Sequence, residues 1–233
     1  MIAAIKNYLK DFSHLLFPQQ CLSCAAEINK HTDILCYKCS LHLPLTNFTD
    51  LKDNPVEKTF IGRINVAQAT SVFYFTKESL LQHLLIQLKY KNNQEVGLFL
   101  GKKLGSELSK NFRFTNIDCM IPLPLSKEKL NFRGYNQATV ICKGIQEKWN
   151  IPINENAVIR KINTQSQTKE NRVNRWQNMK DVFFVPKPAI LKGKHILLVD
   201  DVITTGATLE ACGQAILEAG AASISIATVA WTI

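Results

Sequence analysis

The sequence has relatively few acidic residues and no long apolar run. It contains no stretch of about 18 apolar residues, so we expect no membrane-spanning helix. Lys6, Lys10 and Asp11 interrupt the apolar start of the chain, a pattern that is not typical of a signal peptide, and we expect a reducing, cytoplasmic location. Asp and Glu number 19 against 28 Lys and Arg. The net charge of +9 favours an anionic partner: a phosphorylated small molecule, a nucleic acid or an anionic lipid.

The sequence contains seven cysteines, and this odd number argues against a simple disulfide framework. Four of them form two C-x-x-C pairs, Cys21 with Cys24 and Cys36 with Cys39. Two such pairs can place four thiolates around zinc, and a complete thiolate set leaves no open coordination position, so we predict a structural zinc site. The other three cysteines stand among apolar neighbours, and we expect them to be buried.

Apolar residues alternate between strand-like runs and helical spacing from about residue 64 onward. We predict strands at 66–75, 117–123, 158–162, 195–199 and 224–231, and helices at 2–17, 80–88, 94–109, 135–149 and 207–219. This alternation predicts an α/β fold with a mainly parallel sheet, in which ligands bind at the carboxyl ends of the strands. We expect an N-terminal helix and zinc module at 1–45, a polar linker at 46–62 and the α/β domain at 63–233.

Residues 196–208 combine an apolar strand, two carboxylates and a hydroxyl-rich loop. Asp200 and Asp201 follow the strand, so one carboxylate can bind ribose hydroxyls and the other can bind water on Mg²⁺. The main-chain N–H groups of the next residues can cradle a phosphate at the start of a helix: Thr204, Thr205, Gly206, Ala207 and Thr208. The alternative is a capping sequence whose acidic side chains are solvated.

This segment resembles the 5-phosphoribosyl-1-pyrophosphate (PRPP) signature of type I phosphoribosyltransferases. The resemblance implies that Asp200 and Asp201 bind the ribose hydroxyls and that residues 204–208 bind the 5′-phosphate. Nearly the whole chain resembles the ComF family, in which a four-cysteine zinc module precedes a phosphoribosyltransferase-like domain, and which is associated with DNA uptake during natural competence. Besides the cysteine pairs and the PRPP segment, the resemblance rests on Leu88-Lys89-Tyr90, Ile121-Pro122-Leu123 and Arg133-Gly134-Tyr135-Asn136-Gln137.

The resemblance also implies functions for two loops. Arg133 is the candidate ligand of the pyrophosphate and Gly134 would allow its close approach, whereas the alternative is an exposed basic loop. Residues 163–181 correspond to the mobile catalytic loop, where Gln167 and Arg172 could close over the ligand. The alternative is that this basic loop contacts single-stranded DNA. Lys89 could add charge to the same cleft, although a solvated helix end is the more common outcome.

Two functions of different classes follow. The first is an enzyme that transfers the phosphoribosyl group of PRPP to an acceptor with the help of Mg²⁺, with Asp200, Asp201 and Arg133 as its catalytic residues. The second is a non-catalytic module that binds PRPP or a related ligand and contacts single-stranded DNA or DNA-uptake proteins. The acidic pair favours PRPP binding in both cases and does not decide whether turnover occurs.

Overall fold

The structure, a computed structural model, describes residues 19–28, 34–161 and 182–232. The chain divides into two compact units, residues 1–43 and residues 44–233. The helix expected at 2–17 and the loop expected at 163–181, with Gln167 and Arg172, lie outside the described residues. Within the described ranges, no helix combines the length and the apolar character that a membrane crossing requires.

The first unit is built around its cysteines. An isolated antiparallel bridge joins Gln20 to Glu27, and the second cysteine pair lies at the start of the short helix α2 (Tyr37–Leu41). The Cys36 sulfur caps this helix by accepting from the main-chain N–H of Cys39. Helix α2 buries none of its residues, and the buried apolar side chains of the described part of the unit lie outside it, at Ile28, Ile34, Leu35 and Leu43.

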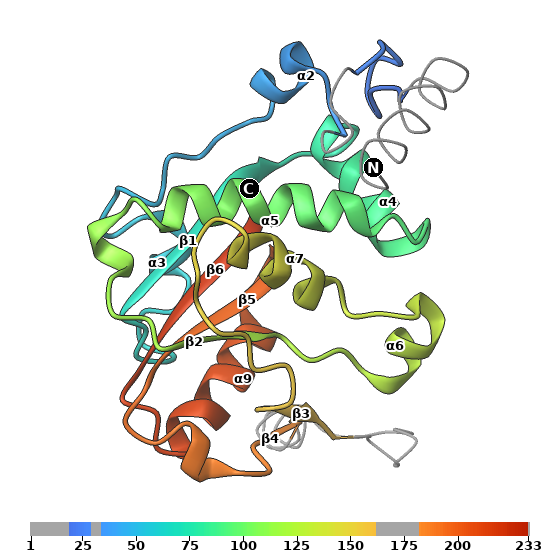
Figure 1. Cartoon of the computed structure of the whole chain (residues 1–233). Helices are drawn as coiled ribbons and strands as arrows, with labels where there is room; N and C mark the ends of the chain where they lie inside the picture. The colour runs from blue at the N-terminus through green and yellow to red at the C-terminus, as the bar shows by residue number, and fades with distance from the viewer. Residues whose placement is uncertain (1–18, 29–33, 162–181, 233) are drawn as a thin grey trace, which may run out of the picture. The chain divides into compact units, whose positions relative to one another are not determined.

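The second unit contains a four-stranded sheet in the order β1-β6-β5-β2, with every neighbouring pair parallel. Its strands are β1 (Gln68–Phe75), β2 (Cys119–Pro122), β5 (His195–Ile203) and β6 (Ser223–Thr232). The parallel α/β fold predicted from the sequence is thereby confirmed (Figure 1). One difference concerns β5, which does not end at Val199 but continues to Ile203, opposite Trp231 of β6.

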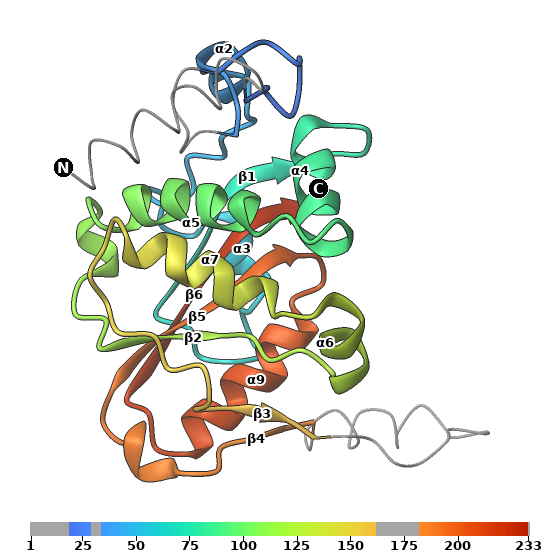
Figure 2. The ribbon, with the colours of Figure 1, turned by 45° about the vertical axis from the view of Figure 1, so that its right-hand side comes forward.

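Helices cover both faces of this sheet (Figures 1 and 2). On one face lie α4 (Leu80–Tyr90), α5 (Gln94–Leu108) and α7 (Gln137–Gln146), and on the other lies α9 (Ala207–Glu218). The strands are buried on both sides, which explains their nearly continuous apolar runs. Helices α5 and α7 approach closely through glycines: a Cβ on Gly101 would lie 2.2 Å from the Ile141 oxygen, and one on Gly144 would lie 2.4 Å from the Leu98 oxygen.

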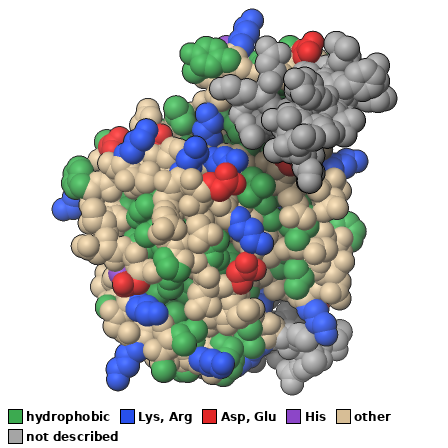
Figure 3. All heavy atoms as spheres, in the orientation of Figure 1, with side chains coloured by type: hydrophobic (Ala, Val, Ile, Leu, Met, Phe, Trp, Pro, Cys, Tyr) green, Lys and Arg blue, Asp and Glu red, His purple; other side chains and the backbone are tan. Residues whose placement is uncertain are grey.

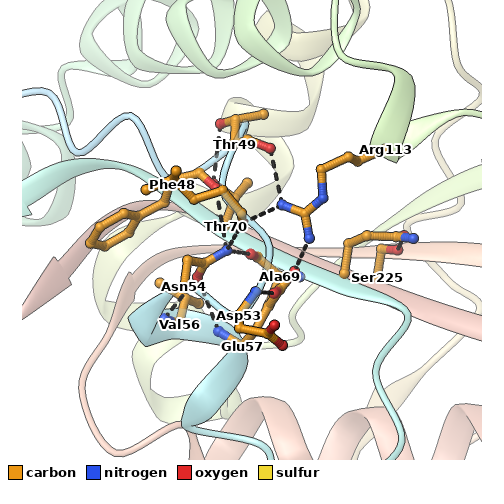
Figure 4. A network of polar contacts seen from close by, with 12 residues as sticks. Phe48, Thr49, Asp53, Asn54, Val56, Glu57, Ala69, Thr70, Arg113 and Ser225 are labelled. Carbon is orange, nitrogen blue, oxygen red and sulfur yellow. Dashed lines mark hydrogen bonds and ion pairs between the residues drawn. The ribbon is translucent and has the colours of Figure 1, made fainter.

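The polar segment 46–62 lies within the second unit, where the sequence analysis expected a linker. Phe48 and Val56 belong to the core on the α9 face of the sheet, and the short helix α3 (Pro55–Lys58) contacts β1. Polar side chains of the segment are also used internally (Figure 4). Asn54 Nδ2 donates to the Ala69 oxygen of β1 at 2.9 Å, and Arg113 Nη1 donates to the Thr49 oxygen at 3.1 Å. Its polar composition therefore reflects satisfied hydrogen bonds, and it is not a spacer.

Smaller elements complete the unit. The turn η1 (Phe112–Phe114) precedes β2, the helix α6 (Lys127–Arg133) precedes α7, and the turn η2 (Pro188–Ile190) precedes β5. The strand expected at 158–162 is present as β3 (Ile159–Arg160). It pairs with β4 (Phe183–Phe184) in an antiparallel ribbon that is separate from the main sheet.

Candidate functional site

The two adjacent carboxylates lie near the carboxyl end of β5. The pairing of β2 with β5 stops at Val199, so Asp200 and Asp201 continue beyond the end of the neighbouring strand. Asp201 is buried, with 4% of its surface exposed, whereas Asp200 is partly exposed. The main-chain N–H of Asp201 donates to Asp200 Oδ1 at 2.8 Å. Ligands of parallel sheets bind at this edge, so the two carboxylates lie where they could contact a bound ligand.

Lys89 supplies the counter-charge to the buried carboxylate. Its ammonium, at the last turn of α4, lies 2.9 Å from Asp201 Oδ2, and the two side chains are 22% and 5% exposed. The solvated helix end that the sequence suggested for Lys89 is therefore wrong. Apart from this ammonium, no donor among the described residues contacts Asp201 Oδ2. A buried carboxylate oxygen with a remaining open lone pair fits a divalent cation of the Mg²⁺ type.

The surroundings of Asp200 shift the pKa of its carboxyl group upward. Burial raises the pKa of Asp200, and the negative charge of Asp201 raises it further. The positive charges of Lys89 and Arg133 act in the opposite direction and are too weak to offset this. Two carboxylates and two cations therefore share this end of the sheet.

Arg133 ends α6 and is held from two sides. Its Nη1 donates to Gln137 Oε1 at 2.8 Å, and its guanidinium carbon lies 5.5 Å from the centre of the Tyr90 ring. Gly134 follows in the left-handed conformation (φ 75°) and ends the helix by donating its N–H to the Leu130 oxygen. Exposed Gly134 leaves room around the backbone at this point, since a Cβ there would meet no atom within 4 Å.

The same loop is tied to the end of α4 and to β2. The Tyr135 hydroxyl donates to the Leu88 oxygen, and Asn136 Nδ2 donates to the Leu123 oxygen at 3.0 Å. The Leu88-Lys89-Tyr90 segment thus contacts the loop that contains Arg133 through its first and third residues, and Asp201 through its second. Three motifs that are far apart in the sequence meet at one edge of the sheet.

The loop after β5 presents hydroxyls to solvent. Thr204, Thr205 and Thr208 are exposed, and Gly206 (φ 71°) is the N-cap of α9 without a side-chain cap. A Cβ on Gly206 would lie 3.0 Å from Thr59 Cγ2 and 3.1 Å from the Phe60 ring, so a larger residue would have to displace this wall. The first turn of a helix without a side-chain cap offers N–H groups to an anion.

Arg63 is hydrogen-bonded both to this loop and to the helix that follows it. Its Nη1 donates to the Thr205 oxygen at 2.7 Å, and its Nε donates to Glu210 Oε2 in the first turn of α9 at 2.9 Å. The described residues also form a cavity of about 680 Å³, lined by Phe60, Arg63, Gln68 and Arg113 among others. It lies at the amino end of β1, away from the carboxylate pair, so it is not the site that the acidic motif defines.

The four N-terminal cysteines form a second candidate site, in the first unit. The sulfurs of Cys21, Cys24, Cys36 and Cys39 all lie within 4.8 Å of one another, and those of Cys24 and Cys36 are 3.7 Å apart. Tetrahedral zinc with Zn–S bonds of about 2.3 Å would separate its sulfurs by about 3.8 Å. The cluster predicted from the C-x-x-C spacing is confirmed, and its dimensions fit a thiolate-bound metal ion.

The thiols also influence one another's ionisation. Burial acts to raise the pKa of Cys21, but hydrogen bonds from the main-chain N–H groups of Cys24, Cys36 and Ser23 outweigh it, and the pKa is lowered. The Ser23 hydroxyl acts to lower the pKa of Cys39, but burial and the three neighbouring thiols raise it overall. Four sulfurs this close cannot all ionise without a cation to balance them, which again fits a metal site.

Comparison with known proteins concerns the fold of the second unit first. The family model described as "Phosphoribosyl transferase domain" matches residues 138–231. The matched residues include β5, α9 and most of β6, so this part of the second unit is similar to a phosphoribosyltransferase domain.

Three curated relatives extend the comparison. "Competence protein ComFC" of Bacillus subtilis is 29% identical over 91% of this chain and 84% of its own. "DNA utilization protein YhgH" of Escherichia coli K12 is 30% identical over 63% of this chain and 65% of its own. "Competence protein F" of Haemophilus influenzae is 33% identical over 47% and 48%. The chain is thus similar to competence-related ComF proteins, and the similarity to the Bacillus subtilis protein includes most of its length.

Proposed function

We propose that the protein binds PRPP, together with Mg²⁺, at the carboxyl end of β5. The observation that carries this proposal is a pair of adjacent carboxylates, one of them buried, flanked on one side by an exposed, hydroxyl-rich helix start and on the other by two cations. In the proposed complex, Asp200 and Asp201 bind the ribose hydroxyls and water on the cation. Residues 204–208 bind the 5′-phosphate, and Arg133, beside Gly134, binds the pyrophosphate.

We further propose that the protein catalyses phosphoribosyl transfer. The bond between C1 of the ribose and the pyrophosphate oxygen breaks, and an acceptor atom forms a new bond to C1. The carboxylates of Asp200 and Asp201 stabilise positive charge that develops on the ribose, and Arg133 stabilises the departing pyrophosphate. Mg²⁺, when bound, balances the phosphate charge. Gln167 and Arg172 are proposed to belong to a loop that closes over the ligand.

For the first unit we propose a structural zinc held by the four cysteine sulfurs. The complete set of four ligands supports a structural role over a catalytic one. Because cysteines that do not form disulfides persist in a reducing environment, we also propose a cytoplasmic location. The names of the Bacillus and Haemophilus relatives refer to competence, and on that basis we propose that this protein acts in DNA uptake, with DNA-uptake proteins among its partners.

A direct contact with single-stranded DNA is the alternative function. The surface of α6 favours it, because Phe132 is 76% exposed and Leu130 is 42% exposed on the same short helix as the exposed Lys127 and Lys129. Exposed aromatic rings next to basic side chains can stack on bases while the cations contact the backbone. On the face shown in Figure 3, however, Lys and Arg side chains are scattered and do not form one continuous band. A DNA contact would therefore be local.

Titration calorimetry with PRPP, in the presence and absence of Mg²⁺, tests the proposed function. We expect Mg²⁺-dependent binding by the natural protein and no binding by the double variant Asp200→Asn with Asp201→Asn. Glu107→Gln, which neutralises an exposed carboxylate on α5, is the matched control and should bind normally. Unchanged affinity of the double variant would refute the proposal. Pyrophosphate release in the presence of candidate bases then decides between turnover and binding alone.

A further inference from the structure

Lys89 occupies the place where a cation would approach Asp201. Its ammonium is 2.9 Å from Asp201 Oδ2, the oxygen that no described residue engages in a hydrogen bond. We infer that Lys89 is a positioning residue that holds this carboxylate until the anionic ligand arrives, so that the divalent cation binds together with the ligand and not before it. This inference rests on the proposed PRPP site.

The position of Lys89 is fixed by its neighbours along the chain. On one side Leu88 is fully buried, and its oxygen accepts a hydrogen bond from the Tyr135 hydroxyl. On the other side the Tyr90 ring lies against the Arg133 guanidinium. Because both flanking residues are anchored to the 133–137 loop, the ammonium is directed toward β5, and only rotation about its own side chain can release it.

The charges at the site explain why the cation and the ligand should bind together. Two carboxylates, Asp200 and Asp201, face two cations, Lys89 and Arg133. Because the carboxylates do not outnumber the cations, this arrangement has no excess negative charge and attracts a free divalent cation weakly. A ligand with several phosphate charges offers Lys89 and Arg133 new partners, so that Asp201 is released for the divalent cation. Lys89 thereby couples binding of the ligand's phosphate groups to binding of the divalent cation at Asp201.

Mn²⁺, used alone as a probe and followed by the loss of its free electron paramagnetic resonance signal, tests this coupling. Lys89→Gln removes the charge but keeps an amide donor for Asp201, which favours a folded protein. We expect this variant to bind free Mn²⁺ at least tenfold more tightly than the natural protein, and to bind PRPP with Mg²⁺ at least tenfold more weakly. Lys91→Gln changes an exposed lysine two residues away and should alter neither affinity. Lys89→Arg keeps the charge and should resemble the natural protein in Mn²⁺ binding.

The natural protein provides a second measurement that does not depend on a variant. The side-chain ammonium resonance of Lys89 should stay unchanged when Mg²⁺ is added alone and should move when PRPP is added with Mg²⁺. Unchanged or weaker Mn²⁺ binding by Lys89→Gln, or a shift of the resonance with Mg²⁺ alone, would overturn the inference. Failure of the natural protein to bind PRPP would refute the proposed function instead, and it would leave the Mn²⁺ comparison of the variants as a separate result.

Discussion

Within the Lys89–Asp201 ion pair, loss of the lysine charge should destabilise the protein far more than loss of the aspartate charge. Lys89→Met leaves the Asp201 carboxylate, which is only 5% exposed, without a counter-charge. Loss of one partner of a buried pair costs about 3–5 kcal/mol of unfolding free energy. Asp201→Asn costs only about 1 kcal/mol, because the Asn oxygen still accepts from Lys89 and the lysine, 22% exposed, can also reach water.

The double variant Lys89→Met with Asp201→Asn separates this pairing from other effects. It has no unpaired buried charge, so it should be more stable than Lys89→Met alone, and the two changes should deviate from additivity by about 2–3 kcal/mol. Urea unfolding at neutral pH, followed by tryptophan fluorescence, measures all four proteins, and Lys91→Met serves as the exposed control. Additive losses, or equal losses for the two single variants, would show that the ion pair does not stabilise the fold.

Four further predictions concern other parts of the chain. Cys36→Ser should release the metal ion and unfold the first unit, which metal analysis and hydrogen exchange would show; a stoichiometric metal content in the variant would contradict this. The pKa of Asp200 is raised by burial and by Asp201, so this group stabilises the fold at low pH and loses that contribution as the pH rises; Asp200→Asn should therefore melt at increasingly higher temperature than the natural protein between about pH 4 and about pH 8, and a constant difference would be evidence against the shift. Gly144→Ala places a Cβ 2.4 Å from the Leu98 oxygen and should cost about 1–3 kcal/mol in denaturant unfolding, whereas a neutral effect would mean that α5 and α7 can separate at little cost. Tyr135→Phe removes the donor to the Leu88 oxygen and should cost about 0.5–1.5 kcal/mol, and an unchanged unfolding midpoint would show that this contact is dispensable.

Local patterns in the sequence were sufficient to predict most of the second unit. Apolar periodicity identified β1, α4, α5, α7, α9 and β6 to within a few residues, because these elements bury one face or both. The same patterns placed the end of β5 too early. Asp200 and Asp201 have low strand propensity, yet β6 continues alongside them and supplies main-chain partners as far as Ile203.

Contacts between distant segments could not be predicted in this way. The polar residues around Asn54 suggested a linker, whereas Asn54 donates to the main chain of β1 and its neighbour Val56 is fully buried. Likewise, the spacing of residues on α4 does not indicate that Lys89 pairs with Asp201, which is more than 100 residues further along the chain. Motif resemblance had singled out both residues, but only the fold shows that they meet.

The position of β6 between β1 and β5 has a consequence for how the chain acquires its structure. The Ser71 hydroxyl of β1 is hydrogen-bonded to that of Thr228, 157 residues later, and β5 has only the short β2 as its other neighbour. Until residues 223–232 leave the ribosome, β1 has no strand partner in the sheet. Pairing over such a distance is slow and leaves strand edges open to other chains. Mutations that weaken β6 should therefore reduce the yield of folded protein during synthesis more than they reduce the stability of protein that has already folded.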